Sequence, residues 1–303
     1  MPSLLVWHSM TKRQQDAQIL IIGGRSYVGR AVASELNGRG KAFVSTTRSS
    51  TLLKEGEIHW DPMDFRTKLP SLPNVNAIVF LATMAGLKGE SPTDIFLANI
   101  QMASRVIDFA NHHGGIRSLI FTSSLAVYGK SNTEKILRYN TPFLDPTGYG
   151  LSKIASEHAL FNELHCDNIV IPRLPSVLGP DAPHGFIPEL LRSLRSGGEI
   201  QIFNQENCFS HAVHINDVVE LILTAIGSKP QKICAPIGST PDISLSEIVE
   251  RCREFTASSS EVILKEDSRV PSSVDSTPWH TLNYTPTSMR ALLEKYLHEN
   301  TPM

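Results

Sequence analysis

A tyrosine and a lysine four residues apart could do acid–base chemistry together. Tyr149 and Lys153 stand in the segment DPTGYGLSK. Residues i and i+4 share one face of a helix, so both side chains can point at one ligand. A free tyrosine has a pKa of about 10 and is a poor base at neutral pH unless a nearby cation stabilises its phenolate. Lys153 would supply that cation, although this spacing also occurs often by chance.

A glycine-rich turn near the start of the chain could hold phosphate groups. The segment GGRSYVG carries Gly23, Ser26 and Gly29 at three-residue steps. Glycines let the backbone turn tightly and approach a pyrophosphate, and the N-terminus of the following helix offers unpaired N–H groups. A turn of this kind that binds nothing is the alternative, and the motif alone leaves both open.

The elements around these residues alternate between strand and helix. Short apolar, β-rich runs lie at residues 18–22, 42–47, 77–83, 118–124 and 168–174, as expected for buried parallel strands. Stretches with apolar residues at helical spacing separate them. This order predicts an α/β fold with a Rossmann-type, doubly wound parallel sheet. Ser124 then lies at the carboxyl end of a strand.

The alternation breaks down after about residue 175. The segment PSVLGPDAPHG is rich in proline and glycine, and later stretches predict isolated helices. We therefore expect a dinucleotide-binding domain at residues 1–175, to which residues 210–238 return. Residues 176–209 and 239–303 would form a smaller C-terminal substrate-binding lobe, which closes a cleft over the carboxyl ends of the strands.

In this order the motifs resemble the extended short-chain dehydrogenase/reductase family, which comprises nucleotide-sugar epimerases, dehydratases and reductases. The resemblance runs nearly end to end, through IIGGRSYVGR, FLAT, TSSLAVYG, YGLSKIASE, PRLPSVLGP, AVHINDVVELI and LNYTP. It implies that Tyr149 passes a proton to or from a substrate oxygen as hydride moves to or from a nicotinamide. It also implies that Ser124 hydrogen-bonds the same oxygen.

The resemblance further implies a set of cofactor contacts. Lys153 would bind the nicotinamide ribose, Asn99 would support that lysine, and Asp61 would accept a hydrogen bond from the adenine amino group. For a lone Asn, an ordinary polar role on a half-buried helix is equally open, and Asp61-Pro62 is also a common turn. The cofactor-binding residues expected in full are Gly23, Ser26, Tyr27, Val28, Gly29, Thr47, Arg48, Ser49, Asp61, Leu81, Ala82, Thr83, Asn99, Tyr149 and Lys153.

The stretch VSTTRSS bears on the choice of cofactor. An acidic residue about 20 positions beyond the glycine turn reads the ribose when NAD is preferred, whereas an arginine accommodates the 2′-phosphate of NADP. This stretch contains Arg48 between hydroxyl side chains and no Asp or Glu. Arginine donates forked, charge-assisted hydrogen bonds to phosphate. We therefore expect NADP(H) to be preferred, with NAD(H) as the alternative. The stretch could also be a solvated polar loop that binds no cofactor.

The relatives implied by this resemblance differ in their net reaction. Dehydratases of the group carry an Asp-Glu pair after the serine position, where this chain has Leu125 and Ala126. The favoured interpretation is an NADPH-dependent reductase of a keto group on a nucleotide-activated sugar. A nucleotide-sugar 4-epimerase and a non-catalytic NADP-sensing protein are the alternatives, and an intact proton relay argues against the sensor. Expected substrate-binding residues are Ser124, Ser176 and Arg269, with Ser210 replacing an arginine common in relatives.

Composition excludes several other classes of protein. A formal charge of −2 over 303 residues provides no basic field for nucleic acid, and no run is long enough to span a membrane. The four cysteines have no CxxC spacing and are typical of reduced thiols in a cytoplasmic enzyme. His211 and His214 stand at alternate positions without an evident third ligand, so we interpret them as structural and expect no metal. A small-molecule substrate is the expected partner, and a homodimer remains open.

Overall fold

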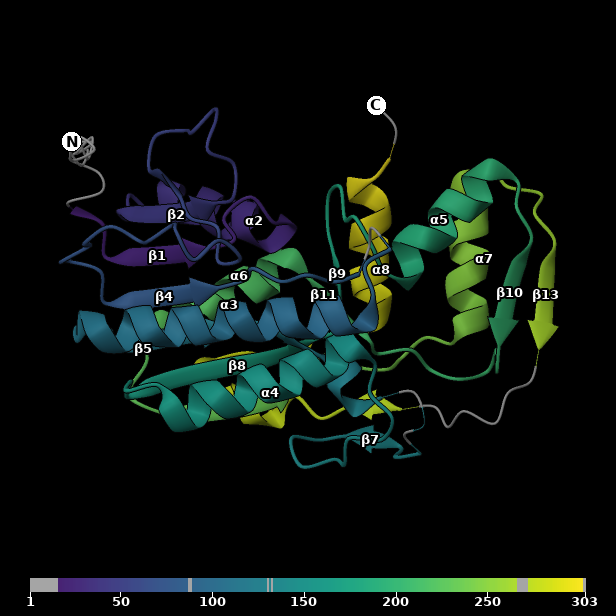
Figure 1. Cartoon of the computed structure of the whole chain (residues 1–303). Helices are drawn as coiled ribbons and strands as arrows, with labels where there is room; N and C mark the ends of the chain where they lie inside the picture. Colours follow the sequence, from purple (N-terminus) through teal and green to yellow (C-terminus); the bar gives the residue numbers. More distant parts are fainter. Residues whose placement is uncertain (1–15, 87–88, 130, 132, 266–271, 302–303) are drawn as a thin grey trace.

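A parallel β-sheet forms the centre of the molecule (Figure 1). The computed structural model describes residues 16–86, 89–129, 131, 133–265 and 272–301. The path of the sheet runs β12-β8-β5-β4-β1-β2-β3, and every neighbouring pair along it is parallel. The order therefore reverses between β1 and β4, which is the switch point at which doubly wound sheets bind ligands. The Rossmann-type fold predicted from the sequence is confirmed.

The strands of this sheet are short and mostly buried. They comprise β1 (Ile19–Ile22), β2 (Phe43–Thr47), β3 (Glu57–His59), β4 (Ala77–Phe80), β5 (Ser118–Phe121), β6 (Ser123–Ser124), β8 (Asn168–Leu174) and β12 (Lys232–Pro236). The five runs predicted as strands are confirmed. Strands β3 and β12 were not predicted. Each lies at an edge of the sheet, where incomplete burial weakens the apolar pattern on which a sequence prediction depends.

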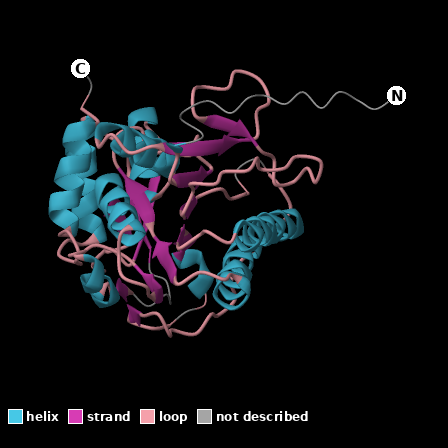
Figure 2. Cartoon of the chain, turned by 90° about the vertical axis from the view of Figure 1, so that its left-hand side faces the viewer, coloured by secondary structure: helices cyan, strands magenta, loops and turns pink. Residues whose placement is uncertain are grey.

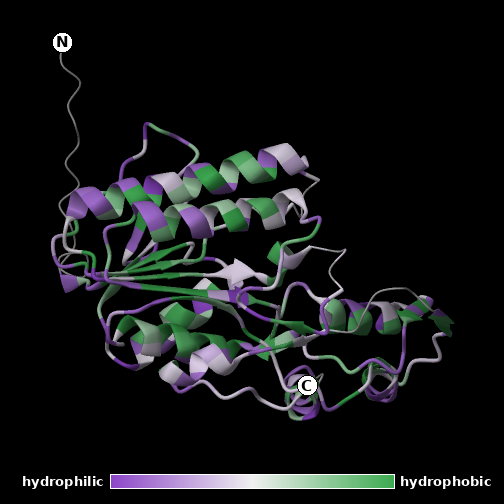
Figure 3. Cartoon of the chain, turned by 90° about the horizontal axis from the view of Figure 1, so that it is seen from below, coloured by the Kyte–Doolittle hydropathy of each residue, from purple (hydrophilic) through white to green (hydrophobic). Residues whose placement is uncertain are grey.

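Helices cover both faces of the sheet, as Figure 2 shows from one end. The helices are α2 (Tyr27–Gly38), α3 (Pro92–His113), α4 (Gly148–Glu163), α5 (Phe186–Ser196), α6 (Ile215–Ile226), α7 (Leu245–Thr256) and α8 (Met289–Glu299), with 3-10 turns η1 (Leu125–Tyr128) and η2 (Thr277–Leu282). Helices α3 and α4 pack together on one face, and α2 and α6 on the other. Apolar strands therefore lie between the helices (Figure 3).

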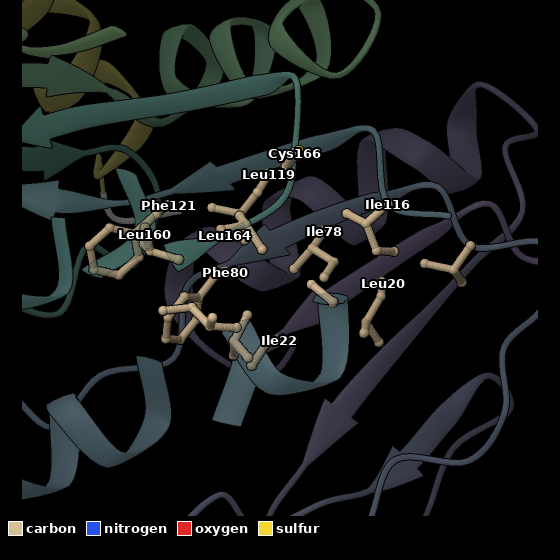
Figure 4. Packing of buried hydrophobic residues seen from close by; sticks show 14 of the residues in the cluster. Leu20, Ile22, Ile78, Phe80, Ile116, Leu119, Phe121, Leu160, Leu164 and Cys166 are labelled. Atoms are coloured by element: carbon tan, nitrogen blue, oxygen red, sulfur yellow. The ribbon is translucent and has the colours of Figure 1, made fainter. Parts of the chain in front are cut away.

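The two faces have separate cores because side chains alternate along each strand. Leu20 and Ile78 belong to the core under α3 and α4, part of which Figure 4 shows. Their neighbours Ile21 and Val79 belong to the core under α2 and α6. All four side chains are fully buried. Burial on both faces explains why these strands are continuous apolar runs rather than alternating ones.

The later part of the chain adds elements beyond the carboxyl ends of the main strands (Figure 1). Within the described residues, three two-stranded pairs lie outside the main sheet: β9 (Ser176–Leu178) with β11 (Ala212–His214), β10 (Ile200–Phe203) with β13 (Val262–Lys265), and β7 (Ile136–Leu137) with β14 (Ser273–Val274). Helices α5, α7 and α8 share a third core with β10. The exact division into two domains stays a prediction.

No helix in the described part of the chain is both long and apolar enough to cross a membrane.

Candidate active site

The glycine turn after β1 packs directly against the end of β4. Gly23 has φ +94°, and a Cβ added there would lie 2.7 Å from the backbone nitrogen of Ala82. The Gly23 N–H donates to Oγ1 of Thr46, at 3.3 Å, on β2. Only glycine combines this conformation with this close approach. The turn is thus held between the carboxyl ends of the two strands that flank β1.

Helix α2 begins immediately behind this turn. Ser26 caps it, because its Oγ accepts from the Gly29 N–H at 3.1 Å. A Cβ on Gly29 would lie 2.4 Å from the carbonyl oxygen of Gly23, so the helix can approach the turn only with glycine at this position. The positive end of the helix dipole therefore lies beside the turn, as anion-binding helices place it.

A recess of about 590 Å³ opens at this switch point. Its walls are the glycine turn, the end of β2 and the end of β4. It brings together eight of the residues predicted to bind the cofactor: Gly23, Ser26, Thr47, Arg48, Ser49, Leu81, Ala82 and Thr83. The close-packed glycines, the helix start and an arginine suit a phosphate-bearing dinucleotide. The residues present therefore fit a nicotinamide cofactor, and we call this space the cofactor recess.

Two arginines line the cofactor recess, one without a hydrogen-bond partner among the described residues and one held in an ion pair. Arg48 is exposed, and no hydrogen bond or ion pair holds it within the described residues. Arg25 is held by the Glu57 carboxylate through contacts of 2.8 and 2.6 Å, and by the carbonyl oxygen of Leu52 at 2.9 Å. Our sequence prediction did not include Arg25, although it stands inside the glycine motif. The glycine motif predicts phosphate contacts from the backbone and assigns no role to the Arg25 side chain.

Asp61 does not line the cofactor recess, although Trp60, Pro62 and Met63 do. Its Oδ1 accepts from the Met63 N–H at 2.9 Å, so the carboxylate stabilises a local turn. The adenine contact expected for Asp61 stays a prediction.

The Tyr149 hydroxyl lies between two serine- and threonine-bearing strand ends. It lies within reach of the side chains of Thr83, which follows β4, and Ser124, which ends β6, and hydrogen bonding from both lowers its pKa. The Ser124 Oγ also accepts from the Ala126 N–H at 3.1 Å, which leaves its hydrogen free for the tyrosine. Burial raises the pKa of Tyr149 above its ordinary value, against the weaker opposite effect of these two hydrogen bonds. The phenol is therefore protonated at neutral pH in this state.

Lys153 lies one helical turn beyond Tyr149 on α4 and is 2% exposed. Its Nζ donates to the Thr122 carbonyl oxygen at 2.9 Å and lies 5.6 Å from the centre of the Tyr149 ring. Burial lowers the pKa of Lys153 to about 7, although the negative charge of Glu157 acts in the opposite direction. Glu157 is itself paired with Arg173 at 2.9 Å. The tyrosine and lysine predicted to share a helix face do so.

Asn99 on α3 makes four hydrogen bonds around this site, none of them to Lys153. Its Oδ1 accepts from Thr83 at 3.2 Å and from the Met84 N–H at 2.8 Å. Its Nδ2 donates to Ser152 Oγ at 2.9 Å and to the Met84 carbonyl oxygen at 3.0 Å. Asn99 thus ties the end of β4 to the residue before Lys153. Its expected support of the lysine is indirect in this geometry.

A second recess, of about 560 Å³, adjoins Ser124. We call it the substrate recess. Ser176 lines it as predicted, together with Tyr27 and Val28, which the sequence prediction had assigned to the cofactor. The full lining is Tyr27, Val28, Ser124, Leu125, Leu174, Pro175, Ser176, Val177, Pro183, His184, Gly185, Phe186, Phe209 and His211. Arg269, the remaining predicted substrate residue, lies outside the described residues.

The two histidines interpreted as structural differ in their surroundings. His214 is buried, caps α6 by accepting from the Asn216 N–H, and contacts Glu299 through Nε2 at 3.0 Å. His211 instead lines the substrate recess, with Nε2 3.0 Å from Ser272 Oγ. Within the described residues, no group of three or more His, Cys, Asp or Glu side chains is arranged to hold a metal ion.

Comparisons with known proteins agree with this geometry. Residues 19–234 match the model of the NAD dependent epimerase/dehydratase family. The chain is 27% identical over 275 residues to a UDP-N-acetyl-alpha-D-glucosaminuronate decarboxylase of Bacillus cytotoxicus, covering 80% of this chain and 82% of the relative. It is 24% identical to a UDP-glucose 4-epimerase of Streptomyces lividans, with the same coverage.

A solved structure shares the fold at lower identity. The Bordetella bronchiseptica enzyme WbmG, solved in complex with NAD and UDP, superposes with a TM-score of 0.77 at 18% identity. The superposition covers 96% of each chain.

Proposed function

The chain belongs to the NAD-dependent epimerase/dehydratase family, and on this premise we propose that it is an NADPH-dependent reductase of a keto group on a nucleotide-activated sugar. One observation carries the proposal. The Tyr149 hydroxyl hydrogen-bonds with Thr83, which lines the cofactor recess, and with Ser124, which lines the substrate recess. Tyr149 itself lines neither recess, but a proton donor held between a residue of each recess suits coupled proton and hydride transfer.

Reduction needs a protonated acid in the resting enzyme. Burial keeps the pKa of Tyr149 above its ordinary value, so the phenol holds the proton that it would give to the carbonyl oxygen. Ser124 would donate a hydrogen bond to the same oxygen and fix its position. Lys153 would stabilise the phenolate left behind. When bound, a reduced nicotinamide supplies the hydride that the carbonyl carbon receives.

Arg48 supports NADPH as the cofactor. It is exposed at the end of β2, unpaired within the described residues, and flanked by Thr47 and Ser49 in the cofactor recess. A 2′-phosphate would receive forked hydrogen bonds from its guanidinium. NADPH also suits a net reduction, because each turnover consumes a reducing equivalent from solution.

The free cysteines are in keeping with a cytoplasmic location.

The substrate class rests on the family and on the substrate recess. Ser124 and Ser176 would contact the sugar, and Arg269 would face the diphosphate. A nucleotide-sugar 4-epimerase is the second candidate, which the similarity to a UDP-glucose 4-epimerase favours. An epimerase regenerates its cofactor in every turnover and would cause no net change in nicotinamide absorbance.

The test is a panel of 4-keto and 4-hydroxy nucleotide sugars, incubated with the enzyme and either NADPH or NADH. We expect one keto sugar to oxidise NADPH stoichiometrically and the 4-hydroxy sugars to oxidise none. Interconversion of 4-hydroxy sugars without net oxidation would identify the epimerase instead. If NADPH binds and no member of the panel reacts, the reductase proposal is wrong.

A further inference from the structure

Of the two histidines that line the substrate recess, His211 is the more buried. It directly precedes β11 and is half-buried, with its Nε2 3.0 Å from the hydroxyl of Ser272. On another side its ring centre lies 6.0 Å from that of Phe209, which in turn lies 5.4 Å from the ring of Phe186. Phe186, Phe209 and His211 all line the recess. The imidazole is thus fixed in orientation at the wall.

The lining of the substrate recess lacks a permanent cation in the described part of the chain. None of its described residues is Lys, Arg, Asp or Glu, and only His184 and His211 can gain a positive charge. Ser210, at the position where many relatives have arginine, is fully buried and is not part of the lining. A diphosphate moved out of water needs a cation or several donors beside it. A protonated histidine can supply both.

We propose that His211 in its protonated form binds the diphosphate of the nucleotide sugar, so that affinity for the substrate increases as the pH falls. This inference rests on the proposed function, because it takes a nucleotide sugar as the ligand. It goes beyond that function by giving the diphosphate a cation that titrates, in addition to the Arg269 contact predicted from the sequence.

The Ser272 contact allows His211 to change its charge without moving. A hydroxyl can donate to a neutral ring nitrogen and can accept from a protonated one. The ring can therefore keep its position in both states, and a hydrogen bond with the Ser272 backbone, which opposes the effect of burial and raises the pKa of His211, favours the protonated one. His184, by contrast, is exposed, so water screens any charge that it gains. For this reason we assign the main effect to His211.

Burial lowers the pKa of His211 below its ordinary value of 6.5, so the empty protein holds it neutral at pH 7. An adjacent diphosphate favours the charged form and raises that pKa. The other titratable side chains that face the recess from the described elements are Tyr27 on α2 and His184 before α5. Tyr27 stays neutral, because burial raises its pKa to about 12. Binding should therefore take up a proton at His211 and weaken as the pH rises.

The experiment measures binding rather than turnover. UDP-glucose, GDP-mannose and dTDP-glucose are titrated into the full-length protein by calorimetry at about pH 5.5 and about pH 8, each beside its free nucleoside. Their diphosphates are diesters that do not titrate in this range. For the nucleotide sugar that binds best, we expect affinity to fall about tenfold or more between the two values, with proton uptake visible as a buffer-dependent heat.

Variants distinguish His211 from the other groups. His211→Asn should remove the pH dependence, whereas His184→Asn should retain most of it. His158→Asn, on the exposed side of α4, is the matched control and should behave as the wild type. Arg269→Ala tests the alternative cation. Circular dichroism and NADPH affinity verify that each variant is folded.

Three results would overturn the proposal: a wild-type affinity that changes less than about twofold with pH, a pH dependence that survives in His211→Asn, or nucleotide sugars that bind no better than their nucleosides. Loss of binding at both pH values in Arg269→Ala alone, with His211→Asn unaffected, would assign the diphosphate to Arg269. None of these results depends on NADPH oxidation. Failure here therefore differs from failure of the reductase proposal, which the substrate panel decides.

Discussion

The cofactor recess and the substrate recess share no lining residue, and they are built in different ways. The cofactor recess is formed by the ends of β1, β2 and β4, which are neighbours in one hydrogen-bonded sheet, and by the turn that follows β1. The substrate recess gathers segments near residues 27, 124, 175, 185 and 210, several of which are loops. One recess is fixed by the sheet, whereas the other depends on how distant segments pack.

This difference explains how a shared cofactor site can accompany different substrates. Strand ends keep their places because the sheet and its two cores determine them. Loops at the carboxyl end can change without disturbing that framework. The family's relatives, with names as different as a decarboxylase and an epimerase, are in accord with this division. Tyr149 lines neither recess but interacts with Thr83 of one and Ser124 of the other, so we expect its variants to have the largest effects.

Replacing Tyr149 with Phe should remove the hydroxyl that interacts with a residue of each recess. The change removes only the hydroxyl, so we expect NADPH affinity within about twofold of the wild type and turnover lowered by about 10²-fold or more. Tyr139→Phe, at an exposed tyrosine, is the matched control. Near-normal turnover in Tyr149→Phe, measured on the substrate that the panel identifies, would remove Tyr149 from the reaction.

Replacing Lys153 with Met should lower turnover strongly and also change the stability of the empty protein. Because its folded pKa is about 7 and its ordinary value is 10.5, the unfolded chain binds more protons between these values. The contribution of Lys153 therefore makes the free energy of unfolding rise with pH across that window and lowers it at and below pH 7.

Urea unfolding at several pH values between about 7 and 10 measures this effect. The difference between Lys153→Met and wild type should favour the variant most at pH 7 and shrink as the pH rises. A constant difference would mean that the folded protein keeps Lys153 fully charged.

Sequence patterns were sufficient for the framework and for eight of the residues that line the cofactor recess. Buried strands are continuous apolar runs, and the spacing of the glycine motif can be recognised in the sequence, although the close contacts of Gly23 with Ala82 and of Gly24 with Ser45 are long-range. The shared helix face of Tyr149 and Lys153 follows from helical periodicity, whereas their predicted roles came from the family resemblance. Edge strands β3 and β12 were missed because they are only partly buried, which weakens their apolar pattern.

The substrate recess could not be predicted to the same extent, because its lining is a matter of long-range packing. The neighbouring sequence does not distinguish His211, which lines the recess, from His214, which lies three residues later and caps α6. Tyr27 and Val28 follow the glycine turn in sequence but lie on the substrate side of α2. The position of the Arg25 side chain could not be predicted, because it depends on an ion pair with Glu57, 32 residues away in the sequence.

Replacing Arg48 with Ala tests the cofactor recess alone. We expect NADPH binding to weaken by about 1 to 3 kcal/mol, which is the scale of charge-assisted hydrogen bonds, and NADH binding to stay nearly unchanged. Arg66→Ala is the matched control, because Arg66 is exposed and pairs with Asp64 outside the recess. Fluorescence titration of the reduced cofactors measures both affinities. Equal weakening for NADPH and NADH would refute the 2′-phosphate contact.

The smallest effect is expected from Thr83→Val, which separates the cofactor side of the Tyr149 hydroxyl from its substrate side. Thr83 can turn its hydrogen from Asn99 towards the phenolate, and this contact lowers the pKa of Tyr149. Its loss should reduce turnover about 2- to 10-fold, the scale of one neutral hydrogen bond. The tyrosine should also stay protonated to higher pH, so the alkaline limb of the turnover profile should move upward. Thr83→Ser retains a hydroxyl and should restore both quantities towards the wild type. An unchanged limb with reduced turnover would mean that Thr83 only shapes the wall of the cofactor recess, and that Ser124 alone adjusts the acidity of the tyrosine.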